Sequence, residues 1–279
     1  MSPNRHDGRV PEGDTVWFVA RQLRDALAGA VLVRSDLRVP KLATADLSGR
    51  KVEDVAARGK HLLMRFEGGW TLHSHLRMEG AWRIYPTGAR WNGGPTHQIR
   101  AILATPECVA VGYRVQELEL LRTVGEAARL KHLGPDLLGP DWDPDEALRR
   151  LVADATRPVG DALLDQRTMA GIGNVYKSEL CFIAGVTPWM PVGEVPEPRR
   201  LVESAHRLLE LNKARFGRVT TDDSRPGRAL WVYGRARQPC LRCGTGIRSA
   251  MQGPAEQPGS DRARSTYWCP GCQAGPSPG

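Results

Sequence analysis

The sequence lacks a long apolar run. Nowhere in its 279 residues does a stretch approach the roughly 20 consecutive apolar residues that a membrane-spanning helix requires. The polar opening MSPNRHDGR also lacks the apolar core of a secretory signal peptide. We therefore expect a cytoplasmic protein that has no membrane partner.

Cysteine is scarce, with six residues, and four of the six form two Cys-x-x-Cys pairs. In a reducing compartment such a set is a poor disulfide framework, so the pairs favour metal binding. The other two, Cys108 and Cys181, lie in apolar surroundings, where buried packing is the expected role.

Lysine is rare too, because 33 of the 39 basic residues are arginine. Basic residues outnumber the 31 acidic ones, which gives a net charge of +8 and a pI near 9.5. This balance favours a polyanionic partner, with nucleic acid first. Charge alone leaves open a soluble protein with a merely basic surface.

The pattern of apolar residues changes along the chain and predicts an α+β multidomain protein. Residues 15–29 have helical spacing, and residues 31–121 hold short alternating runs that predict an N-terminal β-sandwich. The Pro-, Gly- and Asp-rich stretch 122–145 predicts a connector, and helical spacing then continues to about residue 215. Residues 217–228 are expected to form an exposed loop.

The two cysteine pairs are Cys240 with Cys243 and Cys269 with Cys272, separated by 25 residues. Two such turns can supply a closed tetrahedral shell, so we expect one structural zinc ion that holds a small ribbon. The ribbon also carries arginines that can reach phosphates or simply be solvated: Arg242, Arg248, Arg262 and Arg264.

Two further segments have both a chemical and an ordinary interpretation. In AGIGN, the glycines permit close approach and Asn174 is expected to cap the next helix, an arrangement that can hold a DNA phosphate or can be just a turn. In VPEGD, Pro11 and Glu12 precede the first helix, where proline and acidic residues are common.

Taken together, these motifs make the chain resemble the formamidopyrimidine-DNA glycosylase and endonuclease VIII family, most closely bacterial endonuclease VIII. The resemblance rests on five blocks in the family order, namely PEGDTVW at 11–17, RGKHLL at 58–63, LHSHLRMEG at 72–80, LLDQRTMAGIGN at 163–174 and YWCPGCQ at 267–273.

The resemblance implies a domain plan and a partner. The plan is a β-sandwich catalytic domain over 11–121, the connector, a helix-two-turn-helix DNA-binding domain over 146–230 and a zinc finger over 231–275. It also implies a monomer that binds damaged double-stranded DNA in the bacterial nucleoid.

The resemblance further implies roles for single residues. Pro11 is the nucleophile, Glu12 the acid/base residue and Lys60 a basic catalytic residue. Those implied to contact DNA are Asn174 and Arg264 at phosphates, His75 as a weaker candidate, and Met78 as the apolar wedge that enters the base stack. A surface lysine and a buried strand methionine are the ordinary alternatives for Lys60 and Met78.

The implied chemistry needs a free amine at Pro11, because an amide nitrogen cannot form a Schiff base. Ten residues precede Pro11, and we expect residues 1–10 to be a misassigned or removed extension, with translation starting at Val10. Proteolytic maturation and a non-catalytic DNA-binding protein are the alternatives.

The substrate implied is an oxidised pyrimidine, released before β,δ-elimination. The Asp-Pro-Arg-Arg-Phe-Gly-like segment of the purine-directed branch is absent, and VAVGYRVQELELL stands at 109–121. Arg77-Met78-Glu79 differs from the polar-Leu-Tyr wedge of endonuclease VIII, so a preference for oxidised purines stays open.

Overall fold

The computed structural model describes residues 10–215, 217–253 and 264–278, and the chain divides into two compact units, 1–132 and 133–279. Each unit has its own buried apolar core. Apart from Val10, the expected extension lies outside the described residues, as does Arg262. Across the described ranges, no helix combines the length and the apolar character needed to cross a membrane.

The first unit begins with helix α1 (Gly13–Leu27), as the apolar spacing predicts. Its inward face repeats every three or four residues and is at most 2% exposed at Val16, Ala20, Leu23 and Leu27. The helix ends at Leu27 with Ala28 as its C-cap, and Gly29 follows at φ 86°, a left-handed conformation that glycine adopts without a steric cost.

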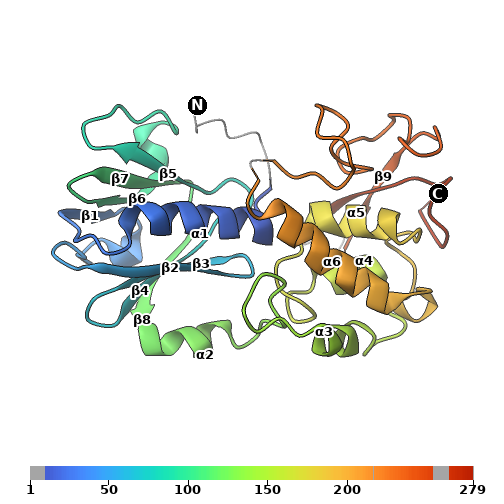
Figure 1. The fold of residues 1–279 in the computed structure, drawn as a ribbon, viewed down its shortest axis with the longest axis horizontal. Helices are drawn as coiled ribbons and strands as arrows, with labels where there is room; N and C mark the ends of the chain where they lie inside the picture. The colour runs from blue at the N-terminus through green and yellow to red at the C-terminus, as the bar shows by residue number, and fades with distance from the viewer. Residues whose placement is uncertain (1–9, 216, 254–263, 279) are drawn as a thin grey trace. The chain divides into compact units, whose positions relative to one another are not determined.

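Two antiparallel four-stranded sheets follow in the first unit (Figure 1). One has the order β1-β6-β7-β5, with strands β1 (Arg34–Leu37), β6 (Ile99–Ala104), β7 (Cys108–Tyr113) and β5 (Ala81–Pro86). The other has the order β2-β3-β4-β8, with strands β2 (Val52–Arg58), β3 (His61–Phe66), β4 (Trp70–His75) and β8 (Glu117–Arg122).

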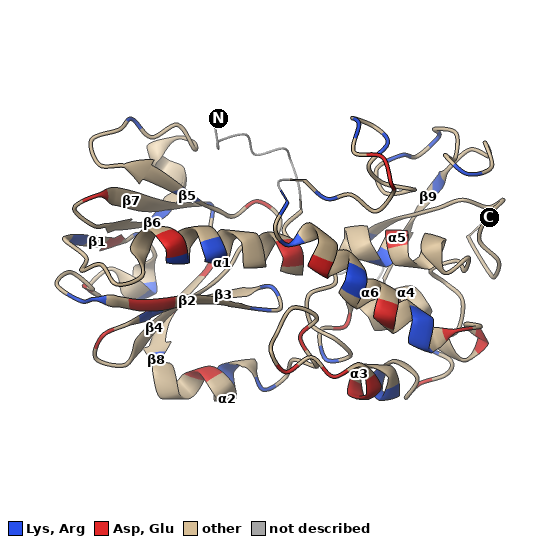
Figure 2. Ribbon diagram, in the orientation of Figure 1, with Lys and Arg blue, Asp and Glu red and all other residues tan. Residues whose placement is uncertain are grey.

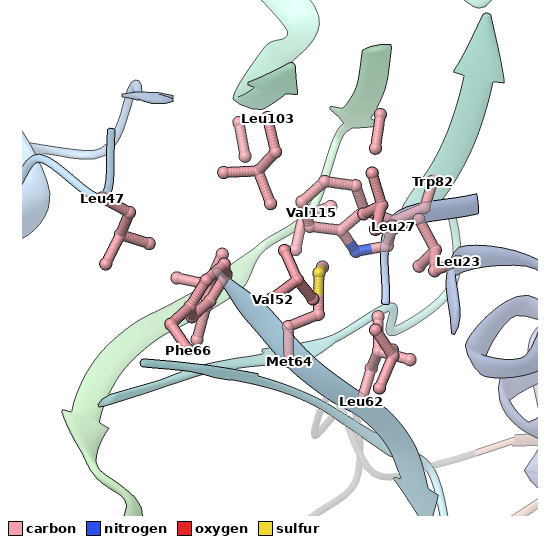
Figure 3. Close-up of a cluster of buried hydrophobic side chains, with 14 of the residues drawn as sticks. Leu23, Leu27, Leu47, Val52, Leu62, Met64, Phe66, Trp82, Leu103 and Val115 are labelled. Atoms are coloured by element: carbon pink, nitrogen blue, oxygen red, sulfur yellow. The ribbon is translucent and has the colours of Figure 1, made fainter. Parts of the chain in front are cut away.

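The two sheets and α1 share one apolar core, which confirms the predicted β-sandwich. Met64 and Phe66 from one sheet lie in the same cluster as Leu103 from the other and Leu27 from α1 (Figure 3). All four are fully buried, and burial of each such side chain contributes about 1.5–3 kcal/mol. The core thus holds the strand ends and turns that carry the candidate catalytic residues.

The stretch 122–145, predicted as a connector, contains structure that its composition did not indicate. Helix α2 (Glu126–Leu130) lies within it, and residues 133–137 are buried. The carboxylate of Asp143 then accepts hydrogen bonds from the N–H groups of Asp145 and Glu146, both at 3.0 Å, and so caps α3 (Pro144–Leu151).

The second unit is mainly helical and ends in a two-stranded ribbon. Its further elements are α4 (Val159–Leu164), α5 (Asn174–Ile183), α6 (Pro198–Asn212), β9 (Arg248–Gln252) and β10 (Arg264–Trp268). Single 3₁₀ turns in the chain are η1 (Pro40–Leu42), η2 (Thr96–Gln98), η3 (Thr123–Gly125) and η4 (Val192–Glu194).

The loop over 217–228 is not fully exposed, contrary to the prediction. The carboxylate of Glu179 on α5 is completely buried, and it accepts hydrogen bonds from the Thr220 hydroxyl and from the backbone N–H groups of residues 231–233 at 2.7–2.9 Å. A buried carboxylate needs such donors, so Glu179 holds Thr220 in the interior. Arg218 is buried as well, with its guanidinium 4.6 Å from the Tyr176 ring centroid.

Candidate functional site

Pro11 and Glu12 stand directly before α1 and are both buried. Glu12 occupies the N-cap position, and its carbonyl accepts the first helical hydrogen bond from the N–H of Val16 at 2.9 Å. Its side chain makes no capping hydrogen bond to the described first turn. The carboxylate beside Pro11 is therefore not used as a helix cap, which was the ordinary interpretation of this motif.

Lys60 lies in the two-residue turn that joins β2 to β3. Gly59 before it has φ 56°, a left-handed conformation that suits glycine in a tight turn. Lys60 is half-buried, and its charge helps to lower the pKa of His75, so the two side chains are near neighbours.

Four histidines gather at this end of the second sheet, a cluster that the sequence analysis did not identify. His61 Nδ1 lies 2.8 Å from His73 Nε2, and the His61 ring centroid is 4.9 Å from that of His75 and 6.1 Å from that of His132. The sequence did contain a signal of this cluster, because His73 and His75 share one face of a strand and His61 follows Lys60 in a motif block.

Burial favours the neutral form of three of these rings, His61, His73 and His75. It lowers the pKa of His61 to about 2, and the neighbouring His75 and His73 add to that effect. Burial likewise lowers the pKa of His75 to about 4 and depresses that of His73, whereas Glu117 and Glu119 act in the opposite direction. Each neutral ring has one N–H donor and one acceptor nitrogen, so each hydrogen bond between these rings requires a particular tautomer.

Met78 lies at the tip of the turn between β4 and β5, and its side chain is 53% exposed. The alternative of a methionine buried in a strand is therefore wrong. The neighbouring Arg77 has φ 53°, its N–H donates to His75 Nδ1 at 3.0 Å, and its guanidinium pairs with Glu117. The bonds of Arg77 thus hold the turn, while the apolar Met78 side chain is exposed to solvent.

In the second unit the fold joins Asn174 to the segment that begins at Arg264. The amide Nδ2 of Asn174 donates to the carbonyl of Ser265 at 2.8 Å, across 91 residues of sequence. The prediction that Asn174 caps α5 is wrong by one residue. Gly173 is the N-cap, with an extended backbone, because the Asn174 side chain is bonded to β10 rather than folded back onto its own helix.

Lys177 on α5 is completely buried, another feature that the sequence did not reveal. Its ammonium group donates to Thr266 Oγ1 on β10 and lies 3.4 Å from Gln252 Oε1 on β9. These bonds tie the ribbon to the helix that begins at Asn174. Asn174 and Arg264 are consequently attached to one hydrogen-bonded block.

The four paired cysteines come together in the ribbon, as predicted. Their Sγ atoms all lie within 4.8 Å of one another, with Cys240 to Cys272 at 3.9 Å and Cys243 to Cys269 at 3.5 Å. Four thiolates 2.3 Å from a tetrahedral zinc ion would be about 3.8 Å apart, so the set fits such an ion. The remaining cysteines do not join it; Cys181 is buried and Cys108 half-buried.

The positive charge of the chain is not gathered on one element. Figure 2 shows Lys and Arg distributed over both units and interspersed with acidic residues. Many arginines are neutralised locally, as in the pairs of Arg65 with Glu126 at 2.8 Å and Arg225 with Asp223 at 2.6 Å. Charge distribution alone therefore does not mark a nucleic-acid interface.

Two family models match this chain. The N-terminal domain model of formamidopyrimidine-DNA glycosylase matches residues 10–114, and the H2TH domain model of the same family matches residues 133–214. Together they cover more than half of the sequence, and each lies within one of the two structural units.

Known bacterial proteins are similar over nearly their full length. The chain is 61% identical over 271 residues to "Probable endonuclease 8 2" of Streptomyces coelicolor, covering 96% of both chains. It is 50% identical over 264 residues to "DNA-(apurinic or apyrimidinic site) lyase Nei2" of Mycolicibacterium smegmatis, covering 95% of this chain and 99% of the relative. Endonuclease 8 of Escherichia coli is 31% identical, at 95% and 100% coverage.

Solved structures have the same fold. The Lactococcus lactis formamidopyrimidine-DNA glycosylase bound to DNA containing an AP site superposes with a TM-score of 0.77 at 24% identity, covering 94% of this chain and 99% of that one. MutM in complex with DNA containing carbocyclic 8-oxoguanine gives a TM-score of 0.77 at 24% identity, with 95% and 100% coverage.

Proposed function

Because this chain belongs to the formamidopyrimidine-DNA glycosylase and endonuclease VIII family of DNA repair proteins, we propose that it excises oxidised pyrimidines and cleaves the strand, using Pro11 as its nucleophile. The observation that carries this proposal is Glu12, a fully buried carboxylate that is adjacent to Pro11 and does not cap α1. A carboxylate in that position can exchange protons with the reacting sugar.

The nitrogen of an N-terminal Pro11 is a secondary amine, and an α-amino group has a pKa of about 8, so part of it is unprotonated near neutrality. This nitrogen attacks C1′ of the damaged nucleotide and displaces the base. The covalent product is an iminium ion, which acidifies the neighbouring C–H. Elimination of the 3′ phosphate follows, and then elimination of the 5′ phosphate. These two steps together are called β,δ-elimination.

Glu12 and Lys60 support these steps in different ways. Glu12 protonates the opening sugar and carries protons during elimination. Lys60, in the turn before β3, places a cation beside the phosphate of the same nucleotide and stabilises the charge that develops there. Its half-buried position strengthens that interaction relative to a fully solvated lysine.

The remaining motif residues bind the DNA. We assign phosphate contacts to Asn174, at the start of α5, and to Arg264, at the start of β10. Met78 enters the base stack when the damaged nucleotide is turned out, which offsets part of the unstacking cost. The partner in this proposal is damaged double-stranded DNA, bound by a monomer.

The metal in this proposal is zinc, held by Cys240, Cys243, Cys269 and Cys272. A bound zinc ion keeps the ribbon folded and takes no part in the reaction, because four thiolates leave no open coordination position. The residues of the chain itself keep the ribbon on α5, through Lys177 and Asn174.

Reductive trapping tests the proposal directly. The protein would be produced once from Val10, so that removal of the initiating residue exposes Pro11, and once from Met1. Each would be incubated with borohydride and duplex DNA that contains thymine glycol or an abasic site. We expect a stable crosslink from the shorter protein and none from the longer one, since a crosslink requires an iminium ion.

Three other results would change the assignment. Efficient trapping by a protein whose ten-residue extension is intact would eliminate Pro11 as the nucleophile. DNA binding by the shorter protein without any trapping would indicate a non-catalytic binding protein. Trapping on 8-oxoguanine in preference to thymine glycol would transfer the proposal to oxidised purines.

A further inference from the structure

We propose that Arg237, in the turn that leads into the cysteine ribbon, binds a DNA backbone phosphate other than the one assigned to Arg264. This inference rests on the proposed function, because it takes DNA as the ligand, and it adds a contact that the sequence analysis did not identify. It follows from the backbone conformation of Arg237 together with the surroundings of its guanidinium.

The first observation is the backbone of Arg237. Residues 235–238 form a β-turn that is closed by a hydrogen bond from the N–H of Gln238 to the carbonyl of Arg235 at 3.0 Å. Arg237 is the third residue of this turn and has a φ of 66°. Glycine and asparagine adopt this left-handed conformation readily, whereas a longer side chain adopts it at an energetic cost. The backbone of the turn thus gives no reason for an arginine.

The second observation is a comparison with the two other non-glycine residues of the described ranges that have a left-handed φ. Both are arginines, and both side chains have partners. Arg77, at φ 53°, pairs with Glu117. Arg114, at φ 50°, donates from Nε to the carbonyl of Glu79 at 3.2 Å. Partners inside the protein therefore account for an arginine at those two positions.

The third observation is that the Arg237 guanidinium lacks such a partner. The residue is exposed, and within residues 10–215, 217–253 and 264–278 no hydrogen bond, ion pair or ring contact involves its guanidinium. Many arginines elsewhere in the chain are neutralised by a nearby carboxylate. A cation that is kept at a sterically unfavourable position without an internal partner indicates an external anion.

The turn that carries Arg237 is held by hydrogen bonds on both sides. Arg235 is buried, and its guanidinium donates to the carbonyl of Trp231 at 2.7 Å and to that of Pro239 at 2.9 Å. The N–H of Arg237 donates to the carbonyl of Ile247 at 2.8 Å, which attaches the turn to the residue before β9. The backbone of the turn is therefore ordered before DNA binds, which lowers the entropy cost of a phosphate contact.

Position along the ribbon separates Arg237 from Arg264. Arg264 pairs with Gln252 in the β9–β10 hairpin. Ile247, to which Arg237 is bonded, lies about 16 Å from Gln252 along an extended strand. Each strand of DNA carries one phosphate per about 3.4 Å of helix axis. The two arginines therefore reach different phosphates, and together they extend the DNA contacts of the second unit.

The test removes the cation without disturbing the turn. Arg237→Gly removes the guanidinium and suits the left-handed backbone, so the variant should not melt below wild type. Arg237→Asn suits the same backbone and should behave in the same way, whereas Arg237→Lys keeps the positive charge. Arg242→Ala is the matched control, because it removes one positive charge from the same ribbon at a guanidinium that already lies on the Phe182 ring.

Binding would be measured against salt, with a duplex that contains a tetrahydrofuran abasic-site analogue. We expect Arg237→Gly to weaken binding by about tenfold, the effect of one charge-assisted hydrogen bond, and to reduce the slope of log affinity against log salt by about one unit. Arg237→Lys and Arg242→Ala should both retain the wild-type slope. Single-turnover excision at saturating protein should change by less than about twofold in Arg237→Gly, because the residue contributes binding alone.

Neutral phosphates would identify the contact. In a series of duplexes, each with one methylphosphonate in place of one phosphate, wild-type protein should lose affinity at every phosphate that it contacts through a cation. Arg237→Gly should become insensitive at one of these positions, and Arg264→Ala at a different one. Loss of sensitivity at the same position in both variants would overturn the assignment of a separate phosphate.

Two further results would overturn the inference, and a third concerns only the chemistry. A wild-type salt slope in both Arg237→Gly and Arg237→Asn would show that Arg237 binds no phosphate, while the proposed function would stand. A lowered melting temperature with loss of zinc in both variants would assign a structural role instead. Failure of wild-type protein to trap with borohydride, while the salt and methylphosphonate results hold, would reject the proposed chemistry and leave the DNA contact of Arg237 standing.

Discussion

The two candidate DNA-contacting regions are built in opposite ways. In the first unit, Pro11 and Glu12 are neighbours in sequence, and one of the bonds that hold the turn carrying Met78 is of short range, from Arg77 to His75. In the second unit, contacts of very long range hold the ribbon to α5, such as that from Asn174 to Ser265. The candidate catalytic pair is thus placed by local sequence, whereas the candidate DNA-binding residues of the second unit are placed by tertiary packing.

The polar groups also differ in kind. The first unit buries neutral imidazoles that must keep one proton arrangement, whereas the second buries the charges of Lys177 and Glu179 together with a cluster of thiols. Buried charges require complete hydrogen bonding, and both residues have several partners. Substitutions in the first region should therefore affect chemistry, and those in the second should affect affinity.

The sharpest separation of the two regions is expected from Glu12→Gln. Loss of proton transfer should lower single-turnover excision of an oxidised pyrimidine by about 10²–10⁴-fold, with affinity for an abasic-site analogue close to wild type. Asp14→Asn, in the first turn of the same helix, is the control and should keep activity. Normal turnover combined with weakened DNA binding would contradict the role of Glu12.

Cys243→Ser should give the next largest effect, confined to the second region. With three thiolates left, the ribbon should lose its metal, and DNA affinity should fall while the sandwich melts as before. Metal analysis, binding assays and thermal melting would measure the three outcomes. Cys108→Ser should retain one zinc ion per chain. Absence of zinc from wild-type protein purified without chelator would reject the metal assignment.

A smaller effect is expected from Arg264→Ala. Loss of a phosphate contact should weaken binding across DNA sequences and reduce the salt slope by about one unit. Arg242→Ala is the matched control, because the Arg242 guanidinium lies 4.4 Å from the Phe182 ring centroid and should contribute about 0.5–1 kcal/mol to stability instead. Equal salt slopes in Arg264→Ala and wild type would show that Arg264 touches no phosphate.

Acid should produce the mildest change, confined to the first region. The pKa of His75 is about 4 in the folded chain, below the usual 6.5, so between these values the unfolded chain binds more protons. Stability is therefore full above pH 6.5 and should fall as the pH decreases, by at most about 1.4 kcal/mol per pH unit for each such histidine.

Denaturant unfolding would measure this loss between about pH 7.5 and about pH 5, a range that includes the ordinary histidine pKa. In the double variant His61→Gln with His73→Gln, the free energy of unfolding should fall less as the pH decreases, because two histidines with a lowered pKa are gone. An equal loss of unfolding free energy at low pH in wild type and in the double variant would show that the cluster does not set the pH dependence of stability.

The local features of this protein could be read from the sequence, because they depend on periodicity and short spacing. The spacing of Val16, Ala20, Leu23 and Leu27 determines α1, and alternation of apolar residues determines the strands of the sandwich. Each Cys-x-x-Cys pair determines one tight turn. Five motif blocks were enough to indicate the family, which the family models and relatives then established.

Other features were decided only by the tertiary structure. Asn174 could not be placed as the first residue of α5 without knowing that its amide bonds to Ser265. Burial of Thr220 in the 217–228 loop follows from its bond to Glu179, and the histidine cluster follows from strand register, which pairs His61 with His75. Each depends on contacts between residues far apart in the chain, and periodicity carries no information about which distant partner a buried polar group will find.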